Sequence, residues 1–243
     1  MKAFLLAAGL GTRLQEHTHD KPKALVSLAG KPLLQHAIER LKSFGISDIT
    51  INVFHFAEQV ISFIEKNQSF GVNIRVSDER DQLLDTGGGL KKASSLLKGN
   101  EPILIYNVDV ISNLDLNLLL NYHLQHNALA TLVVRPRETS RYLMFDPNLQ
   151  LAGWKNFGNG ESRISRPGSF ENARPLAFSG IHIIQPKMLE LITEEGKFPI
   201  IDLYLRLAKN HAIKAFVDNS TIWMDVGKPD QLRAAEMLFR LKD

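Results

Sequence analysis

The strongest constraint on this chain is a short apolar run near its beginning that ends in two closely spaced glycines. Residues 4–8 read Phe-Leu-Leu-Ala-Ala and are followed by Gly9 and Gly11. A continuous apolar run bounded by glycine is typical of a strand that is buried on both faces of a sheet. In an open α/β sheet, ligands bind beyond the carboxyl ends of such strands. We therefore expect a binding site directly after residue 8.

The loop that follows has the chemistry of a phosphate site. Gly9 and Gly11 let the backbone turn sharply and bring N–H groups close to an anion. Arg13 adds a planar guanidinium that is always charged, and Lys21 and Lys23 follow within ten residues. A strand that leads into a glycine-rich, cation-bearing loop predicts phosphate binding.

These two segments also resemble the opening of a known family. Residues 6–14 (Leu-Ala-Ala-Gly-Leu-Gly-Thr-Arg-Leu) and 21–25 (Lys-Pro-Lys-Ala-Leu) resemble the first motif of the sugar-1-phosphate nucleotidyltransferases, which make nucleoside-diphosphate sugars. The match departs at residues 15–18, where Gln-Glu-His-Thr stands in place of the family's usual Pro-Leu-Thr. The charged residues of the family motif, Arg13, Lys21 and Lys23, are present in this chain.

The resemblance implies roles for the loop residues. It places Arg13 on the β- and γ-phosphates of a nucleoside triphosphate and Lys23 near the α-phosphate, as the catalytic cations. The loop residues that it implies in nucleotide binding are Ala8, Gly9, Gly11 and Thr12.

Composition limits the class of protein. A chain of 243 residues that is 44% hydrophobic can bury one substantial core. The 29 basic and 26 acidic residues nearly balance, so we expect no nucleic-acid partner. The absence of cysteine excludes disulfides and thiolate metal sites, and it fits a reducing compartment.

The beginning of the chain bears on its location. Residues 1 and 2 lead directly into the first apolar run, which leaves no room for a cleavable signal peptide. No apolar run approaches the roughly 18 residues of a membrane span. We therefore expect a cytoplasmic protein without a membrane partner. We also expect a monomer or a homodimer.

Apolar runs alternate with amphipathic patterns through the first half, which predicts an α/β fold. We expect a Rossmann-like, mixed but mostly parallel sheet with helices on both faces. The predicted strands of this half are 4–8, 49–53, 72–76, 103–106 and 130–134, and the predicted helices are 32–45, 56–64, 90–97 and 115–126.

The pattern of predicted elements changes after Pro136. Residues 142–185 form shorter strand-like pieces, and residues 153–172 are polar and glycine-rich, which predicts a mobile hairpin or lid. We interpret residues 1–243 as a single domain, with 137–185 as an insertion that faces the sugar and with no β-helix domain. The elements predicted beyond it are helices at 186–194, 200–209 and 229–241 and strands at 213–217 and 222–225.

Two aspartates stand where predicted strands end. Asp109 follows the buried strand 103–106, and Asp225 follows Ile222-Trp223-Met224. Each could be an ordinary strand-end or capping residue. Together they could hold one Mg²⁺, because magnesium takes one or two carboxylates plus phosphate oxygens and water.

The family resemblance favours the metal interpretation. Asn107-Val108-Asp109 stands where the family has its Gly-Asp metal ligand, and residues 223–227 match the segment of the second ligand. The resemblance therefore implies Mg²⁺ on Asp109 and Asp225, with Asn107 at the nucleotide. Val108 is a departure, since glycine is usual there, and its side chain is expected to narrow the nucleotide channel.

Three consecutive glycines follow Asp85-Thr86. They could form a flexible turn between a strand and the helix that runs to residue 97, or a bare backbone surface for a nucleotide base. The family has a base-recognition loop here, which implies Gly87 and Gly88 as nucleotide-binding residues. The Thr-Gly-Gly-Gly form resembles uridylyltransferases acting on N-acetylmuramic acid 1-phosphate and some mannose-1-phosphate guanylyltransferases, so uracil and guanine both stay open.

The sugar site is expected in the second half. Residues 178–182 (Phe-Ser-Gly-Ile-His) resemble the family segment that lines the sugar, which implies Ser179 and Gly180; the alternative is a strand bulge at the glycine. The family's Glu-Lys-Pro triplet, whose lysine holds the sugar phosphate, is absent. Lys155 and Asn156 stand at about that place and are its expected substitutes.

The resemblance thus predicts a Mg²⁺-dependent enzyme that joins a nucleoside triphosphate and a sugar 1-phosphate and releases pyrophosphate. UTP with an amino-sugar 1-phosphate is the preferred pair; GTP with mannose 1-phosphate is the alternative. An NAD-dependent dehydrogenase would need a third glycine at position 14 and an acidic residue at the end of the second strand. The chain has Leu14 at the first position and Asn52-Val53-Phe54 at the second, so it does not fit that class. A non-catalytic nucleotide- or sugar-sensing relative is the other alternative, although the chain keeps the loop arginine and both aspartates.

Overall fold

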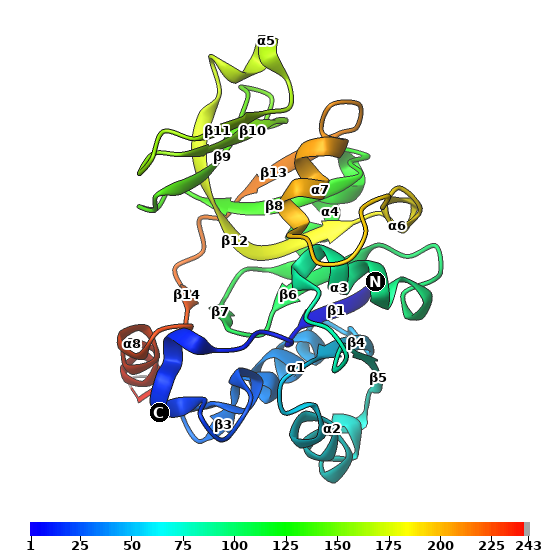
Figure 1. Ribbon diagram of the computed structural model, residues 1–243, viewed down its shortest axis with the longest axis vertical. Helices are drawn as coiled ribbons and strands as arrows, with labels where there is room; N and C mark the ends of the chain where they lie inside the picture. The colour runs from blue at the N-terminus through cyan, green and yellow to red at the C-terminus, as the bar shows by residue number, and fades with distance from the viewer. Residues whose placement is uncertain (241–243) are drawn as a thin grey trace.

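The computed structural model describes residues 1–240, without the side chain of Gln15. Ten strands form one sheet, in which β11, β10, β9, β12, β6, β1, β4 and β5 are neighbours in that order and β12 also carries β8 and then β13 (Figure 1). The strands are β1 Lys2–Leu6, β4 Asp48–Val53, β5 Asn73–Asp78, β6 Ile103–Asn107, β8 Ala130–Arg135, β9 Arg141–Phe145, β10 Leu151–Asn156, β11 Ser162–Ile164, β12 Arg174–Ile184 and β13 Ile213–Val217.

Two short antiparallel strand pairs, eight α-helices and four short 3-10 helices complete the regular elements of the described residues. The pairs are β2 Ser27–Leu28 with β3 Lys31–Pro32, and β7 Val110–Ser112 with β14 Trp223–Asp225. The α-helices are α1 Leu33–Ser43, α2 Ala57–Lys66, α3 Asp85–Ala93, α4 Leu116–Gln125, α5 Pro167–Phe170, α6 Lys187–Glu190, α7 Ile200–Leu207 and α8 Pro229–Arg240. None of the described helices is long and apolar enough to cross a membrane.

The centre of the sheet is mostly parallel. β1 pairs in parallel with β4 and β6, β4 with β5, and β8 with β13. β12 is the exception, because it runs antiparallel between β6 and β8 and then continues out of the centre to pair with β9. This mixed sheet confirms the predicted α/β class.

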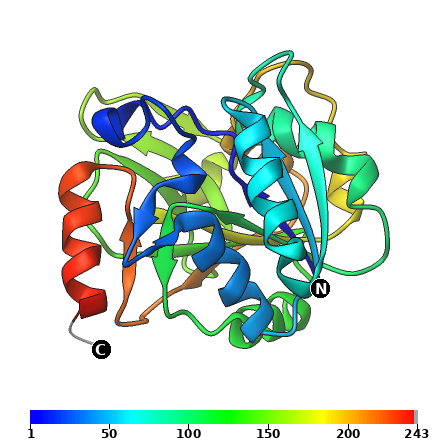
Figure 2. The ribbon, with the colours of Figure 1, turned by 90° about the horizontal axis from the view of Figure 1, so that it is seen from below.

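Helices cover both faces, as the unbroken apolar run of β1 predicts. Ala3 and Leu5 of β1 pack in one core with α1, α2, α4 and α8, whereas Phe4 packs in a second core with α3, α6 and α7. Alternate residues of a strand point to opposite faces, so each strand residue is buried under one layer or the other. Figure 2 shows α1 and α2 in front of the strands, with α8 at the edge.

Residues 137–185 divide into two parts. β9, β10, β11 and α5 extend the sheet at the top of Figure 1, away from α2. Residues 182–184 of β12 instead pair with both β6 and β8, inside the central sheet. The sugar-facing role of this segment and its description as a lid stay predictions.

Several element boundaries differ from the sequence expectations. The glycines of residues 87–89 lie inside α3 rather than ahead of it. Residues 153–172, predicted as a hairpin or lid, contain the end of β10, then β11, which pairs antiparallel with β10, and α5. The helix expected at 186–194 is only α6, and the last residue of the helix expected at 229–241 lies outside the described residues. The strand pair β7–β14 includes one strand that the sequence did not predict.

Candidate functional site

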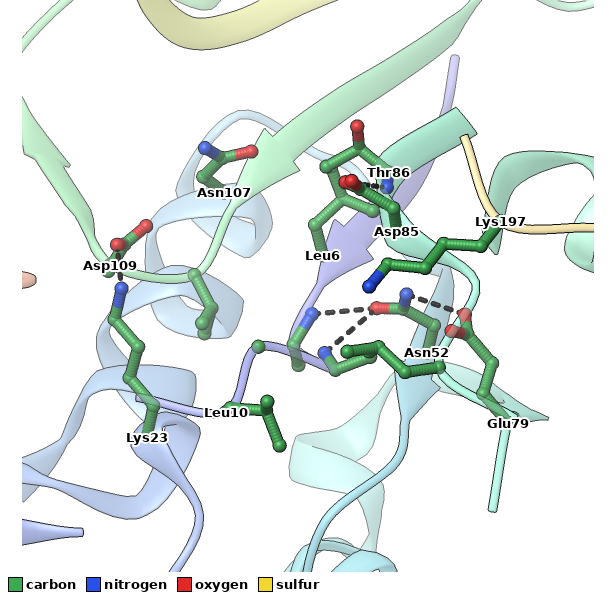
Figure 3. A pocket seen from close by; sticks show the side chains of 15 residues that line it. Leu6, Leu10, Lys23, Asn52, Glu79, Asp85, Thr86, Asn107, Asp109 and Lys197 are labelled. Atoms are coloured by element: carbon green, nitrogen blue, oxygen red, sulfur yellow. Dashed lines mark hydrogen bonds and ion pairs between the residues drawn. The ribbon is translucent and has the colours of Figure 1, made fainter. Parts of the chain in front are cut away.

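A cavity of about 330 Å³ lies at the carboxyl ends of β1, β4 and β6. Figure 3 shows that its labelled side chains come from the first half of the chain, except for Lys197. The residues that line the cavity are Leu6, Ala7, Ala8, Gly9, Leu10, Lys23, Asn52, Glu79, Leu83, Asp85, Thr86, Asn107, Val108, Asp109 and Lys197. The expected nucleotide-site residues Ala8, Gly9, Lys23, Asn107 and Asp109 are among them, and so is Val108.

The glycine turn leaves room and free donors on its cavity side. A methyl group on Gly9 would find nothing within 4 Å, whereas one on Gly11 would lie 2.8 Å from Thr18 Cγ2. Gly11 also has φ +68°, a left-handed conformation that favours glycine. Among the described atoms, the N–H groups of Gly9 and Leu10 donate to no protein acceptor. These groups are therefore available to an anion beside the turn.

A buried side-chain pair fixes the start of this turn. Asn52 Oδ1 accepts hydrogen bonds from the N–H groups of Ala7 at 2.7 Å and Ala8 at 3.3 Å. Asn52 Nδ2 donates to Glu79 Oε1 at 2.7 Å, which sets the orientation of the amide (Figure 3). Glu79 is fully buried, and this burial raises its pKa against the effect of the Asn52 hydrogen bond.

The charged residues converge on the turn after β14. The backbone ties the two aspartates together, since Val226 N–H donates to the Asp109 carbonyl at 2.9 Å. Lys23 Nζ forms an ion pair with Asp109 Oδ2, and Arg13 Nη2 lies 3.9 Å from Asp225 Oδ2.

Gly227 lies at the centre of this group. A methyl group on it would lie 2.6 Å from Arg13 Nη2, 2.7 Å from Asp225 Oδ1 and 3.1 Å from Lys23 Nζ. The two predicted cations and the two predicted carboxylates therefore form one cluster beside the glycine turn. The carboxylates are more than 100 residues apart in the sequence, and the pairing of β7 with β14 brings them together in space.

The donor set suits a magnesium ion that shares its shell with phosphate. The described residues contain no cluster of three or more histidine, cysteine or acidic side chains, so no all-protein cage is present. Asp109 in the turn before β7 and Asp225 at the end of the neighbouring β14 match the preference of Mg²⁺ for one or two carboxylates together with phosphate oxygens and water. The Lys23 ammonium now neutralises Asp109, as a cation at that carboxylate would. Asp109 and Asp225 as metal ligands remain a prediction.

Gly87 and Gly88 are not among the residues that line the cavity, although the adjacent Thr86 is. A methyl group on Gly87 would clash with the Phe198 ring, and one on Gly88 would clash with the Gly196 carbonyl. On Gly89 it would lie 2.7 Å from Glu79 Oε1. The glycine run thus lets α3 pack closely against residues 196–198 and against the buried glutamate. Base contact by Gly87 or Gly88 stays a prediction.

Gly87→Ala is expected to lower the free energy of unfolding by about 1–3 kcal/mol, because the added methyl overpacks against Phe198. Denaturant unfolding measures the loss. Gly168→Ala is the matched control, since Gly168 also lies in a helix and its methyl would find nothing within 4 Å. Equal stability of Gly87→Ala and wild type would show that packing does not explain this glycine.

The expected sugar residues fall into two groups. Gly180 has φ +74°, and a methyl on it would lie 2.7 Å from Asn107 Nδ2, so this residue borders the cavity wall. Ser179 is buried, and its carbonyl accepts a hydrogen bond from Trp223 Nε1 at 3.0 Å. The pairing of β12 with β8 shifts register between residues 178 and 182, so the glycine does lie at a bulge.

Lys155 and Asn156 lie on β10 and do not line the cavity. Lys155 Nζ lies 4.9 Å from the centroid of the Phe157 ring, and Asn156 Oδ1 accepts from Gly158 N–H at 2.9 Å. Both side chains therefore have local partners within the β10–β11 hairpin. Their contact with a sugar stays a prediction.

Comparison with known proteins identifies the family. The model of the nucleotidyl transferase family matches residues 2–240. The chain is 33% identical to N-acetylmuramate alpha-1-phosphate uridylyltransferase from Caulobacter vibrioides, over 96% of this chain and 95% of that protein. It is 32% identical to a mannose-1-phosphate guanyltransferase from Yarrowia lipolytica, over 98% of this chain but only 64% of that protein.

Solved structures agree on the fold. HddC from Yersinia pseudotuberculosis, in complex with GMP-PN, superposes with a TM-score of 0.76 over 98% of this chain and 99% of its own, at 23% identity. A UDP-glucose pyrophosphorylase in complex with UDP-glucose gives a TM-score of 0.78 over 100% and 99%, at 19% identity. With the cavity and the charged cluster in place, the chain belongs to the nucleotidyl transferase family, among the sugar-1-phosphate nucleotidyltransferases.

Proposed function

We propose that this enzyme joins UTP to an amino-sugar 1-phosphate, such as N-acetylmuramic acid 1-phosphate, and releases pyrophosphate. The observation that carries the proposal is the match to the Caulobacter uridylyltransferase along nearly the whole of both chains. The guanyltransferase from Yarrowia, at almost the same identity, extends well beyond the matched part.

The chemistry needs no protein nucleophile or general base. A sugar 1-phosphate oxygen is already anionic, so it can attack the α-phosphate of the nucleotide in line while pyrophosphate leaves. Catalysis then consists of alignment and of neutralising phosphate charge. The free N–H groups of Gly9 and Leu10, and the clustered Lys23 and Arg13, are suited to that role.

Each cation has a part in this proposal. Lys23 lies at the cavity wall and steadies the α-phosphate, while the more exposed Arg13 stabilises the charge that develops on the leaving pyrophosphate. Asp109 and Asp225 would hold Mg²⁺, which supplies further charge neutralisation between the two phosphate-bearing substrates.

A GTP-dependent reaction with mannose 1-phosphate is the second candidate. It is favoured by the guanyltransferase relatives, which are 31–32% identical across 98% of this chain. The cavity itself offers a carboxylate at Asp85 and an ammonium at Lys197, which can pair with the imide edge of either base.

Pyrophosphate release from a panel of triphosphates and sugar 1-phosphates, in Mg²⁺ and with an EDTA control, tests the proposal. We expect the fastest turnover with UTP and N-acetylmuramic acid 1-phosphate, and none in EDTA. Faster turnover with GTP and mannose 1-phosphate would favour the second candidate. Tight nucleotide binding without turnover of any pair would indicate a sensing protein and overturn both.

A further inference from the structure

Arg137 is a half-buried cation whose hydrogen-bonding capacity is only partly used. Its Cζ lies 4.6 Å from the centroid of the Trp223 ring, its Nη2 donates to the Phe178 carbonyl at 3.2 Å, and its Nη1 donates to the Glu138 carbonyl at 3.5 Å. Its Nε is buried and has no hydrogen-bond partner among the described residues. The guanidinium is thus held in place by an aromatic ring and two backbone carbonyls, and each of its terminal nitrogens carries a second N–H beyond the one that it donates to a carbonyl.

This cation also lacks an ion pair. No described carboxylate lies within 4.0 Å of Arg137, whereas Arg135 on the same segment is paired with Asp218 at 2.6 Å. Burial lowers the pKa of Arg137, and the charge of Asp225 partly offsets this effect. A charge removed from water without a bonded counter-charge is costly, and an anionic ligand would relieve that cost.

The surroundings of Arg137 connect it to the site. Trp223 begins β14, which ends at Asp225, and its Nε1 donates to the Ser179 carbonyl. The next residue, Gly180, packs directly against Asn107 in the cavity wall. Arg137 is not itself among the cavity-lining residues, but its contacts with Phe178 and Trp223 place it beside the β12 bulge and the strand that carries Asp225.

We propose that Arg137 binds the phosphate group of the sugar 1-phosphate. This inference rests on the proposed function. It assigns to Arg137 the part expected of Lys155, whose ammonium lies over the Phe157 ring on β10. A planar guanidinium already fixed against a ring suits phosphate, because it presents its charge and its remaining N–H groups at little cost in side-chain entropy.

The choice of phosphate follows from the positions of the cations. Arg13 reaches Asp225 from the glycine turn, where the nucleotide phosphates are proposed to lie. Arg137 instead contacts the β12 bulge, where the expected sugar residues Ser179 and Gly180 lie. A kinetic experiment separates the two phosphates, since each substrate has its own KM.

The test compares Arg137→Gln and Arg137→Lys with wild type. Arg137→Gln is expected to raise the KM for the sugar 1-phosphate on the order of 10- to 100-fold, the usual worth of one hydrogen bond to a charged group. The KM for the nucleoside triphosphate is expected to stay unchanged. Arg137→Lys should recover part of the loss, because it keeps the charge and loses the fork.

Arg163→Gln is the matched control. Arg163 lies 4.6 Å over the Trp154 ring, and its Nε is also buried without a partner, but it pairs with Asp202 away from the cavity. Its loss should leave both KM values at wild-type levels. If Arg137 acts only by packing on Trp223, then Asp225 shifts and the nucleotide KM changes together with the sugar KM, which would contradict the proposal.

Calorimetric titration with N-acetylmuramic acid 1-phosphate measures the binding affinity directly and so tests the inference without turnover. Weaker binding to Arg137→Gln than to wild type supports it. Equal affinity, or no binding to either protein, overturns it. A wild-type enzyme that is active with this sugar while Arg137→Gln keeps a normal sugar KM would refute the role of Arg137 and leave the proposed function standing.

Discussion

Asp225→Asn is expected to lower kcat on the order of 10²-fold or more, the effect of losing one preorganised electrostatic contact at the reacting phosphates. The substitution is nearly isosteric, and Asp225 Oδ1 accepts from Gly227 N–H at 2.9 Å, a bond that an asparagine oxygen can keep. The turn should therefore stand while the negative charge is lost. Steady-state pyrophosphate release at saturating substrates measures the change.

Asp109→Asn is expected to have an effect of the same order on kcat. It also leaves Lys23 without its carboxylate, and both side chains are only 12% exposed, so stability should fall as well. Thermal unfolding must therefore accompany the kinetics, with rates compared below both transitions. Near-normal turnover in either variant would remove that residue from the metal site.

Asp202→Asn is the control for both substitutions. Asp202 is also partly exposed and paired with an arginine, Arg163, but it lies on α7 and does not line the cavity. Its loss should leave kcat unchanged. A similar fall in kcat for this control would mean that the loss of a surface ion pair, rather than of a metal ligand, explains the kinetics.

The opening strand and its loop could be predicted because local chemistry determines them. The apolar run of β1 requires cover on both faces, and Gly11 requires a left-handed backbone. The convergence of Asp109 and Asp225 depends instead on the β7–β14 pair, which joins segments more than 100 residues apart. Their positions after two predicted strands left a shared Mg²⁺ open, and the family resemblance favoured it over ordinary strand-end roles.

Buried polar pairs were the main features missed. Asn52 stands in an apolar strand and Glu79 directly after the next strand, and each alone could be an ordinary strand-end residue. Their meaning comes from a contact between neighbouring strands, where the amide bridges the carboxyl to the turn after β1. The available signal in the sequence was Asn52, a polar residue between the apolar residues of a predicted strand.

The glycine run shows how one pattern serves two physical needs. Bare backbone suggests an open surface for a base, but it equally permits close packing. In α3 all three glycines are buried, and each would clash with or crowd a different neighbour if it had a side chain. Arg137 was missed for the opposite reason, because nothing in its local sequence distinguishes it from the surface arginines around it.

Lys23→Ala is expected to lower kcat on the order of 10²-fold, because the α-phosphate loses its preorganised cation. The fold should persist, since the backbone bond between Val226 and Asp109 and the β7–β14 pairing do not involve Lys23. The variant also frees the Asp109 carboxylate from its ammonium partner. Mg²⁺ should therefore raise the Tm of Lys23→Ala more than that of wild type.

The control for this substitution is Lys31→Ala, in which an exposed lysine loses its ion pair with Glu39. Its kcat and its Mg²⁺-induced shift in Tm should match those of wild type. Unfolding of Lys23→Ala at every Mg²⁺ concentration would assign the lysine a structural role. A folded variant with the wild-type Mg²⁺ shift would mean that Asp109 does not bind the metal, because removing a competing cation from a metal ligand must strengthen metal binding.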